Sequence, residues 1–189
     1  MAAEVGGTQA DSFEAANEAD LIALVIPAPA ITETVEKVMG LAKAGAIIIN
    51  LATSAHIDAV IKAREPAVRV IEAKIIGHAA SMAEGNPGIV VVDTADQAAF
   101  NLIRSQLPGF QEVVRGDADL VPKINELATA AAIRIAVDVR KQLRGIAIPE
   151  SWITVALKTI CAGVVKAFAE DDLGDFGQGL VRQLEQEDA

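Results

Sequence analysis

Apolar runs alternate with amphipathic segments along residues 1–117 of the chain. Runs without regular polar positions are typical of strands that are covered on both faces of a parallel sheet. The pattern predicts strands at residues 19–26, 46–51, 68–76, 89–92 and 110–114. The polar positions that alternate within residues 68–76 also predict that one face of that strand is more exposed.

Amphipathic segments between these strands predict helices. They lie at residues 32–44, 57–65 and 95–107. Asp11 with Glu14, and Thr94 with Gln97, have the spacing of capping boxes at helix starts. Residues 77–88 are rich in Gly and Ala and predict a loop. Strands that alternate with helices indicate an α/β domain.

From residue 118 the apolar positions follow helical spacing alone. We predict helices at residues 118–144, 149–170 and 175–186, with Pro149 in the first helical position. Residues 127–137 contain Arg134 as their only charged residue. Helices that are apolar on most sides must be covered by other protein. We therefore expect an α/β domain at residues 1–117 and a C-terminal helical module at residues 118–189, through which the chain forms a homodimer.

Composition and charge narrow the function classes. Aromatic residues make up only 3% of the chain, so the core must consist of small aliphatic side chains. The net charge of −10 disfavours nucleic acid and anionic lipid as partners. Residues 1–20 lack the apolar stretch of a secretory signal, and no run reaches the roughly 18 apolar residues of a membrane span. These features predict a cytoplasmic protein without membrane contact.

Two stretches of the sequence are similar to a known superfamily. ADLIALVIPAPAITETVEKV, followed by GAIIINLATS, resembles the middle of the nucleotide-binding domain in the 6-phosphogluconate dehydrogenase-like superfamily, which includes β-hydroxyacid dehydrogenases and pyrroline-5-carboxylate reductases. The resemblance covers about residues 5–145. It implies a partial Rossmann-like, mostly parallel sheet followed by a C-terminal helical module, and it implies NAD or NADP as the cofactor.

The sequence departs from this superfamily in its phosphate-binding unit. Members begin with a strand, a GxGxxG turn and a helix, and the glycines let the backbone approach the pyrophosphate. No GxGxxG occurs in this chain. We expect either a naturally short protein or a truncated start, with cofactor binding that depends on a partner or a missing segment. The strand at residues 19–26 is then expected near an open sheet edge that forms an interface.

The resemblance implies cofactor contacts from two loops. Pro27, Ala28 and Pro29 follow the first long strand, where relatives contact the cofactor, although a simple strand-ending turn explains them equally well. Thr53 and Ser54 follow the second strand and would lie near the nicotinamide. Either residue also suits the cap of the helix expected near Ile57.

The resemblance also implies two catalytic candidates. Lys123 near the start of a long helix matches the lysine that moves a proton at the substrate oxygen in β-hydroxyacid dehydrogenases, but their asparagine one turn later is Leu127 here. A solvated surface lysine is the alternative. His78 lies in the Gly-rich loop and is a candidate acid, base or anion ligand, or a loop residue without function. The two histidines and one cysteine form no metal-binding pattern.

The sequence leaves two function hypotheses open. The first is an NAD(P)-dependent dehydrogenase or reductase of a small anionic or imine substrate. The second is a non-catalytic small-molecule-binding or assembly module derived from such an enzyme. Lys123, Thr53 and Ser54 favour the first, whereas Leu127 and the absent GxGxxG favour the second.

Overall fold

The computed structural model describes residues 9, 12–58, 61, 63 and 67–187. It divides into two compact units, Met1–Glu126 and Leu127–Ala189. The division falls within a long helix, α5 (Leu120–Arg144). The sequence boundary expected at residues 117/118 lies just before this helix.

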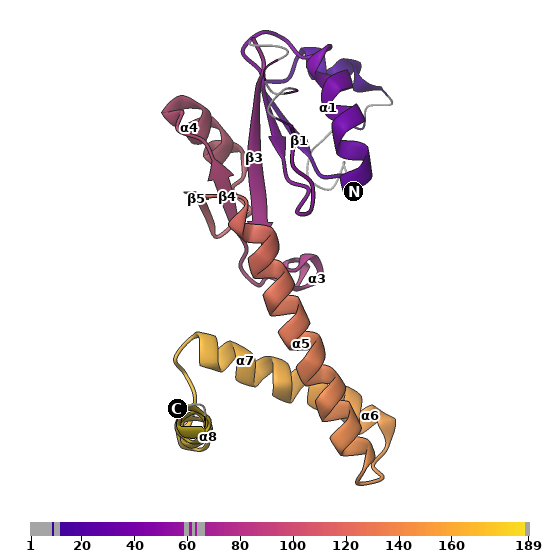
Figure 1. Cartoon of the computed structure of the whole chain (residues 1–189), viewed down its shortest axis with the longest axis vertical. Coiled ribbons are helices and arrows are strands. Elements are labelled where there is room, and N and C mark those ends of the chain that lie inside the picture. Colours follow the sequence, from indigo (N-terminus) through magenta and orange to yellow (C-terminus); the bar gives the residue numbers. More distant parts are fainter. Residues whose placement is uncertain (1–8, 10–11, 59–60, 62, 64–66, 188–189) are drawn as a thin grey trace. The chain divides into compact units, whose positions relative to one another are not determined.

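Five strands form one sheet in the described part of the first unit (Figure 1). In spatial and chain order they are β1 (Leu21–Leu24), β2 (Ile47–Asn50), β3 (Arg69–Ile76), β4 (Ile89–Asp93) and β5 (Glu112–Arg115). Neighbouring strands are parallel except for the antiparallel pair β3 and β4. The predicted α/β fold with a mostly parallel sheet is therefore confirmed, and β1 lies at one edge of the described sheet.

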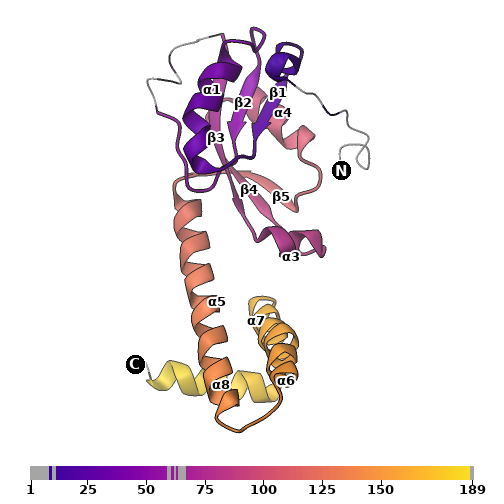
Figure 2. The ribbon, with the colours of Figure 1, turned by 90° about the vertical axis from the view of Figure 1, so that its right-hand side faces the viewer.

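Helices cover both faces of the sheet (Figure 2). The side chain of Ile48 packs in one apolar cluster with Val35 of α1 (Ile31–Met39). Ile47 and Ile49 belong to a second cluster, which contains Ile103 of α4 (Gln97–Gln106). Successive side chains of a strand point to opposite faces, so the continuous apolar run of β2 supplies both cores. This explains why the run shows no polar alternation.

The prediction that one face of β3 is more exposed is wrong. Its four central residues, Ile71 to Lys74, are all buried. Glu72 and Lys74 produce the polar alternation in the sequence, but their charged groups pair with each other in the interior. The helix expected at residues 57–65 falls largely outside the described residues.

Two helix starts also differ from the sequence analysis. Ser12 caps the 3₁₀ helix η2 (Phe13–Asn17), because its hydroxyl accepts the N–H of Glu14, and the expected cap residue Asp11 lies outside the described residues. Asp96, not Thr94, caps α4, because its carboxylate accepts the N–H groups of Ala98 and Ala99. At the start of α4, Asp96 has the better position for the first unpaired N–H groups of the helix.

The expected loop at residues 77–88 contains a short helix, α3 (Ala79–Ala83). The sulfur of Met82 packs against the backbone of Gly77 and Gly88. A Cβ atom at these two glycines would lie only 2.6 and 2.9 Å from that sulfur, so a larger residue at either position would displace the Met82 side chain.

The second unit is helical throughout its described elements. After α5 follow α6 (Glu150–Val155), the π-helical turn η4 (Ala156–Cys161), α7 (Ala162–Ala169) and α8 (Asp175–Glu187). Pro149 caps α6 from outside instead of occupying its first position. Arg144 at the end of α5 forms two hydrogen bonds with the carboxylate of Glu150, at 3.1 and 2.9 Å.

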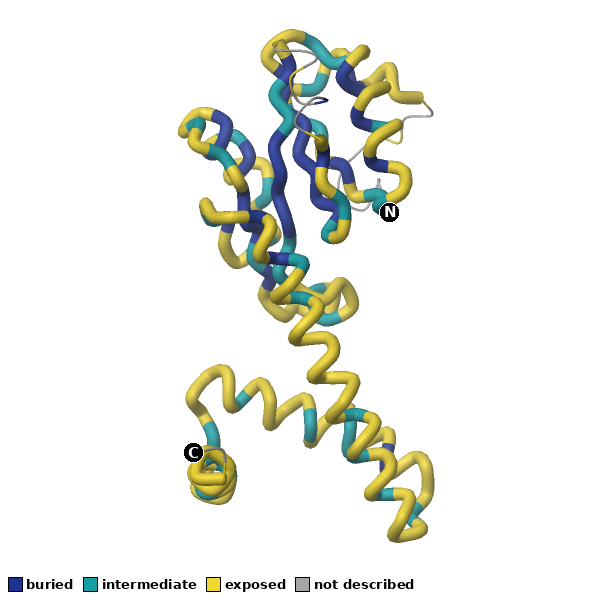
Figure 3. Tube along the Cα trace, in the orientation of Figure 1, coloured by how far each residue is buried: buried dark blue, intermediate teal, exposed yellow. Residues whose placement is uncertain are grey.

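Most apolar side chains of the second unit are exposed (Figure 3). Ile153 is the single buried residue among the described residues of this unit. Large exposed side chains lie on all its helices: Leu127, Ile133, Ile135, Val137, Trp152, Val155, Ile160, Val164, Val165, Phe168, Phe176, Leu180 and Leu184. Contiguous exposed apolar surface of this kind is typical of protein interaction sites.

The continuous helical stretch Glu150–Ala169 has the length and apolar composition of a membrane span, with a mean hydropathy of 1.5 over its apolar window. No stretch of this kind was predicted from the sequence. Lys158 and Lys166 lie within it, and length and composition alone also describe a helix that another protein surface covers.

Candidate functional site

The carboxyl ends of β1, β2 and β3 lie at one edge of the sheet because these strands are parallel. The segment Pro27–Pro29 follows β1, Thr53 and Ser54 follow β2, and His78 follows β3. Topology therefore brings these sequence-predicted segments to the same edge, where open α/β sheets bind their ligands. We call this edge the carboxyl edge.

The segment after β1 is a tight turn into a helix. Pro27 precedes the 3₁₀ turn η3 (Ala28–Ala30), and α1 begins directly afterwards at Ile31. An apolar cavity of about 520 Å³ lies beside β1 and includes Pro27 and Ala30 in its lining. Its other lining residues are mostly aliphatic, so it suits an apolar group better than a phosphate.

Buried polar side chains form hydrogen bonds with the backbone of the loop after β2. The Asn50 side chain accepts the N–H of Ala52 at 3.0 Å and donates to the carbonyl oxygen of Ala55 at 2.7 Å. Lys74 donates from Nζ to the carbonyl oxygens of Ala52 and Ala55, both at 2.7 Å. Thr53 is half-buried and Ser54 is exposed above these groups.

Glu72 connects these groups to one another. Its Oε2 lies 2.9 Å from Nζ of Lys74 and accepts a hydrogen bond of 2.8 Å from the Asn50 amide. Its Oε1 accepts the N–H of Ile57 at 2.7 Å. Asn50, Glu72 and Lys74 are all buried, and we call them the β2-loop network. This network was not predicted from the sequence, although two charged residues inside an apolar strand are a signal for it.

The segment after β3 places His78 on the surface. His78 has an extended backbone and immediately precedes α3, and its side chain is exposed. Within the same segment the Asn86 amide donates to the carbonyl oxygen of Ser81 at 3.2 Å. His78 is thus accessible to a ligand at the carboxyl edge.

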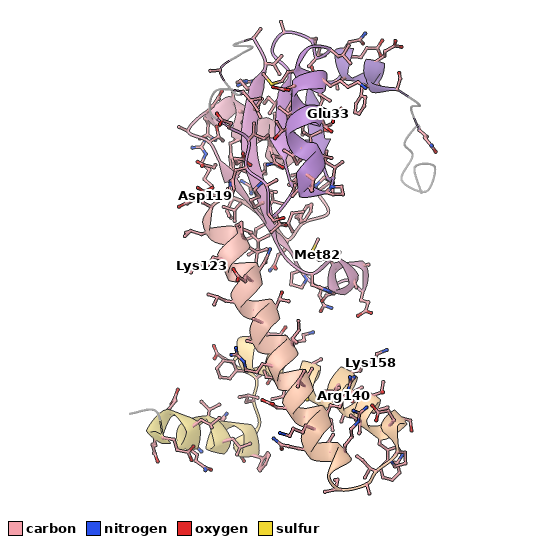
Figure 4. All side chains as sticks on the ribbon, turned by 45° about the vertical axis from the view of Figure 1, so that its right-hand side comes forward. Glu33, Met82, Asp119, Lys123, Arg140 and Lys158 are labelled. Carbon is pink, nitrogen blue, oxygen red and sulfur yellow. The ribbon has the colours of Figure 1, made fainter. Side chains whose placement is uncertain are left out.

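The start of α5 contacts the same edge (Figure 4). Asn125 donates from its amide to the carbonyl oxygen of Ile75 in β3 at 2.9 Å. Asp119, directly before α5, lies 3.2 Å from Nδ1 of His56 in the β2 loop. His56 is exposed and joins two segments of the site.

Lys123 lies between these two contacts on α5 and is exposed. It is two residues from Asn125, which places the two side chains about 200° apart around the helix. Asn125 faces β3, so Lys123 points away from that contact.

The carboxyl edge thus presents hydroxyl and imidazole groups, which bind anions and transfer protons. In the described part of the chain, no cluster of three His, Cys, Asp or Glu side chains has the geometry of a metal site. These groups suit acid–base chemistry on a small polar ligand.

A mostly parallel sheet with helices on both faces, followed by helices, defines the Rossmann-like class of nucleotide-binding folds. No protein-family model matches the chain, and no curated protein matches its sequence. Solved structures do match. A pyrroline-5-carboxylate reductase from Coxiella burnetii superposes with a TM-score of 0.69 at 17% identity, over 98% of this chain and 68% of that chain.

Two further structures extend this similarity. A semialdehyde dehydrogenase NAD-binding protein from Cupriavidus necator, solved with calcium and NAD, has a TM-score of 0.65 at 13% identity and covers 97% of this chain and 75% of its own. A pyrroline carboxylate reductase from Plasmodium falciparum with NADP bound has a TM-score of 0.63 at 9% identity, with coverages of 90% and 65%. At such identities the similarity establishes the fold.

The chain is shorter than these structures. It spans 60% of a matching chain from Mycobacterium avium 104, and 68% and 75% of the Coxiella and Cupriavidus chains.

Proposed function

We propose that this chain is the substrate-facing part of an NAD(P)-dependent dehydrogenase or reductase of the 6-phosphogluconate dehydrogenase-like type. The observation that carries the proposal is the convergence of Pro27–Pro29, Thr53–Ser54 and His78 on the carboxyl edge. Structures of the same fold that are named pyrroline-5-carboxylate reductase or imine reductase support it. They favour a small anionic or imine substrate over a macromolecular one.

The residues at this edge fit one end of a nicotinamide cofactor. Thr53 and Ser54 offer hydroxyl groups beside the turn at Pro27–Pro29, which suits ribose and nicotinamide groups. The turn into α1 has the sequence Pro-Ala-Pro-Ala instead of the glycines that admit a pyrophosphate. We propose that another segment or a partner supplies the phosphate-binding groups.

The proposed catalytic groups are Lys123 and His78. The bound nicotinamide would supply or accept the hydride. Lys123 at the start of α5 would hold the proton at the substrate oxygen or nitrogen, with His78 as the other candidate for this role.

The proposed assembly is a homodimer in the cytoplasm. A second copy of the C-terminal helices would cover the exposed apolar side chains of the second unit, and β1, the edge strand of the described sheet, offers a further interface. The net charge of −10 argues against nucleic acid and anionic membranes as partners.

The test is a titration with NADH and NADPH, followed by the fluorescence of the reduced nicotinamide. We expect saturable binding of one of the two, and about tenfold weaker binding in a Thr53→Val/Ser54→Ala variant, the equivalent of ~1.4 kcal/mol. Ser105→Ala, at an exposed serine of α4, is the matched control. Absence of binding to the chain and to any complex that it forms would refute the proposal.

A further inference from the structure

The β2-loop network has features that stability alone does not explain. The side chains of Lys74 and Glu72 are 0% and 6% exposed, and their charges lie 2.9 Å apart. Buried ion pairs are often replaced by apolar side chains of similar volume without loss of stability. The polar atoms of this pair instead bind backbone groups of residues 52–57, which belong to no helix or strand.

The network also determines which way the loop peptides face. Lys74 draws the carbonyl oxygens of Ala52 and Ala55 toward the interior. A trans peptide group directs its N–H opposite to its carbonyl, so the N–H groups of Thr53 and His56 face away from Lys74. Ala52 and Ile57 are buried while Ser54 and His56 are exposed, which is the pattern this constraint produces.

We infer that Lys74, together with Glu72 and Asn50, is a positioning residue that fixes the β2 loop in its ligand-binding shape. The inference rests on the proposed function, because this loop carries Thr53 and Ser54. Lys74 lies beneath the loop and touches no ligand itself. Loss of the network therefore weakens cofactor binding and loosens the loop, whereas the fold persists.

The decisive variant is Glu72→Gln/Lys74→Met, which removes both buried charges together. We expect a thermal midpoint within about 3 °C of the original, because no unpaired charge is left inside. The Kd for the reduced cofactor is expected to rise about tenfold, and amide hydrogen exchange in residues 52–57 to accelerate about tenfold. Lys43→Met, at a partly exposed lysine paired with Asp20, is the matched control, and it leaves the cofactor Kd and the loop exchange rate unchanged.

A folded double variant with unchanged cofactor affinity and unchanged loop exchange overturns the inference. Acceleration in β2 and β3 as large as in the loop also overturns it, because the role would then be structural only. If the double variant does not fold, Asn50→Ser decides, since it removes the amide donors and keeps the ion pair. If the original protein binds neither NADH nor NADPH, the proposed function fails, and the exchange of residues 52–57 still decides whether the network positions the loop.

Discussion

The two units of this chain use apolar side chains in opposite ways. The first unit buries β2 between helices on both faces of its sheet, and it encloses even the charges of Glu72 and Lys74. The second unit buries Ile153 alone among its described residues and leaves large side chains such as Trp152 and Phe168 exposed. The first unit therefore contains its own core, whereas the second exposes most of its large apolar side chains, as surfaces that bind other protein do.

The largest effect is expected from the core of the first unit. Ile48→Ala removes a side chain that is 0% exposed between β2 and α1, and we expect it to lower the free energy of unfolding by about 2–5 kcal/mol. Ile146→Ala, at a residue that is 66% exposed in the second unit, is the matched control and changes the free energy of unfolding by less than about 0.5 kcal/mol. Urea titration measures both. Equal losses of stability from the two substitutions would show that the two units do not differ in how they bury apolar side chains.

The next largest effect concerns the proposed dimer interface of the second unit. Ile160→Glu replaces an exposed apolar side chain of η4 with a charged one. We expect it to weaken association of the proposed homodimer about 100-fold, or ~2.7 kcal/mol. Sedimentation velocity over a range of protein concentrations measures this change. Lys158→Gln, at an exposed residue of the same turn, keeps the dimer. A protein that is monomeric with and without Ile160→Glu would remove the homodimer from the proposal.

The first unit was largely predictable from the sequence, because continuous apolar runs have few alternatives to buried strands. The direction of β4 was not predictable, since a run of apolar residues contains no information about which neighbour it pairs with. The segment at residues 77–88 joins an antiparallel pair, and its packing depends on the contact of Met82 with Gly77 and Gly88.

The candidate site was predictable only in its exposed loops. Thr53, Ser54 and His78 follow recognisable strands, so their common edge follows from parallel pairing. The β2-loop network was missed because Glu72 and Lys74 have the spacing of solvent-facing residues. The contact between His56 and Asp119 joins segments far apart in sequence, and no local pattern specifies such a pair.

A smaller effect is expected where α5 attaches to the sheet. Asn125→Ala removes the hydrogen bond to Ile75 and is expected to lower the free energy of unfolding of the first unit by about 1 kcal/mol. Lys123→Ala, two residues away and exposed, is expected to leave stability unchanged and to lower activity. Unfolding curves and turnover of an imine substrate separate the two effects. A stability loss from Lys123→Ala would place that lysine in packing instead of chemistry.

The smallest effect is expected from a fall in pH. It can be compared between the two units at one carboxylate in each. The N–H of Ala99 and the guanidinium of Arg69 hold the pKa of Asp96 below its usual value in the first unit. Hydrogen bonding and charge attraction from Arg144 lower the pKa of Glu150 in the second unit. A lowered pKa in the folded state stabilises that state above the unfolded pKa, and this contribution is lost as the pH falls through the folded pKa.

Both units should therefore lose this contribution below about pH 4, within the range where unfolded carboxyl groups also take up protons. Asp96→Asn keeps an N-cap of similar quality but loses the ion pair with Arg69, so it reduces the acid sensitivity of the first unit alone. Glu150→Gln does the same for the turn between α5 and α6. Amide hydrogen exchange measured from pH 3 to pH 6 reports each region separately. If either variant changes both regions equally, the two units unfold as one cooperative body, and the contrast between them is limited to their surfaces.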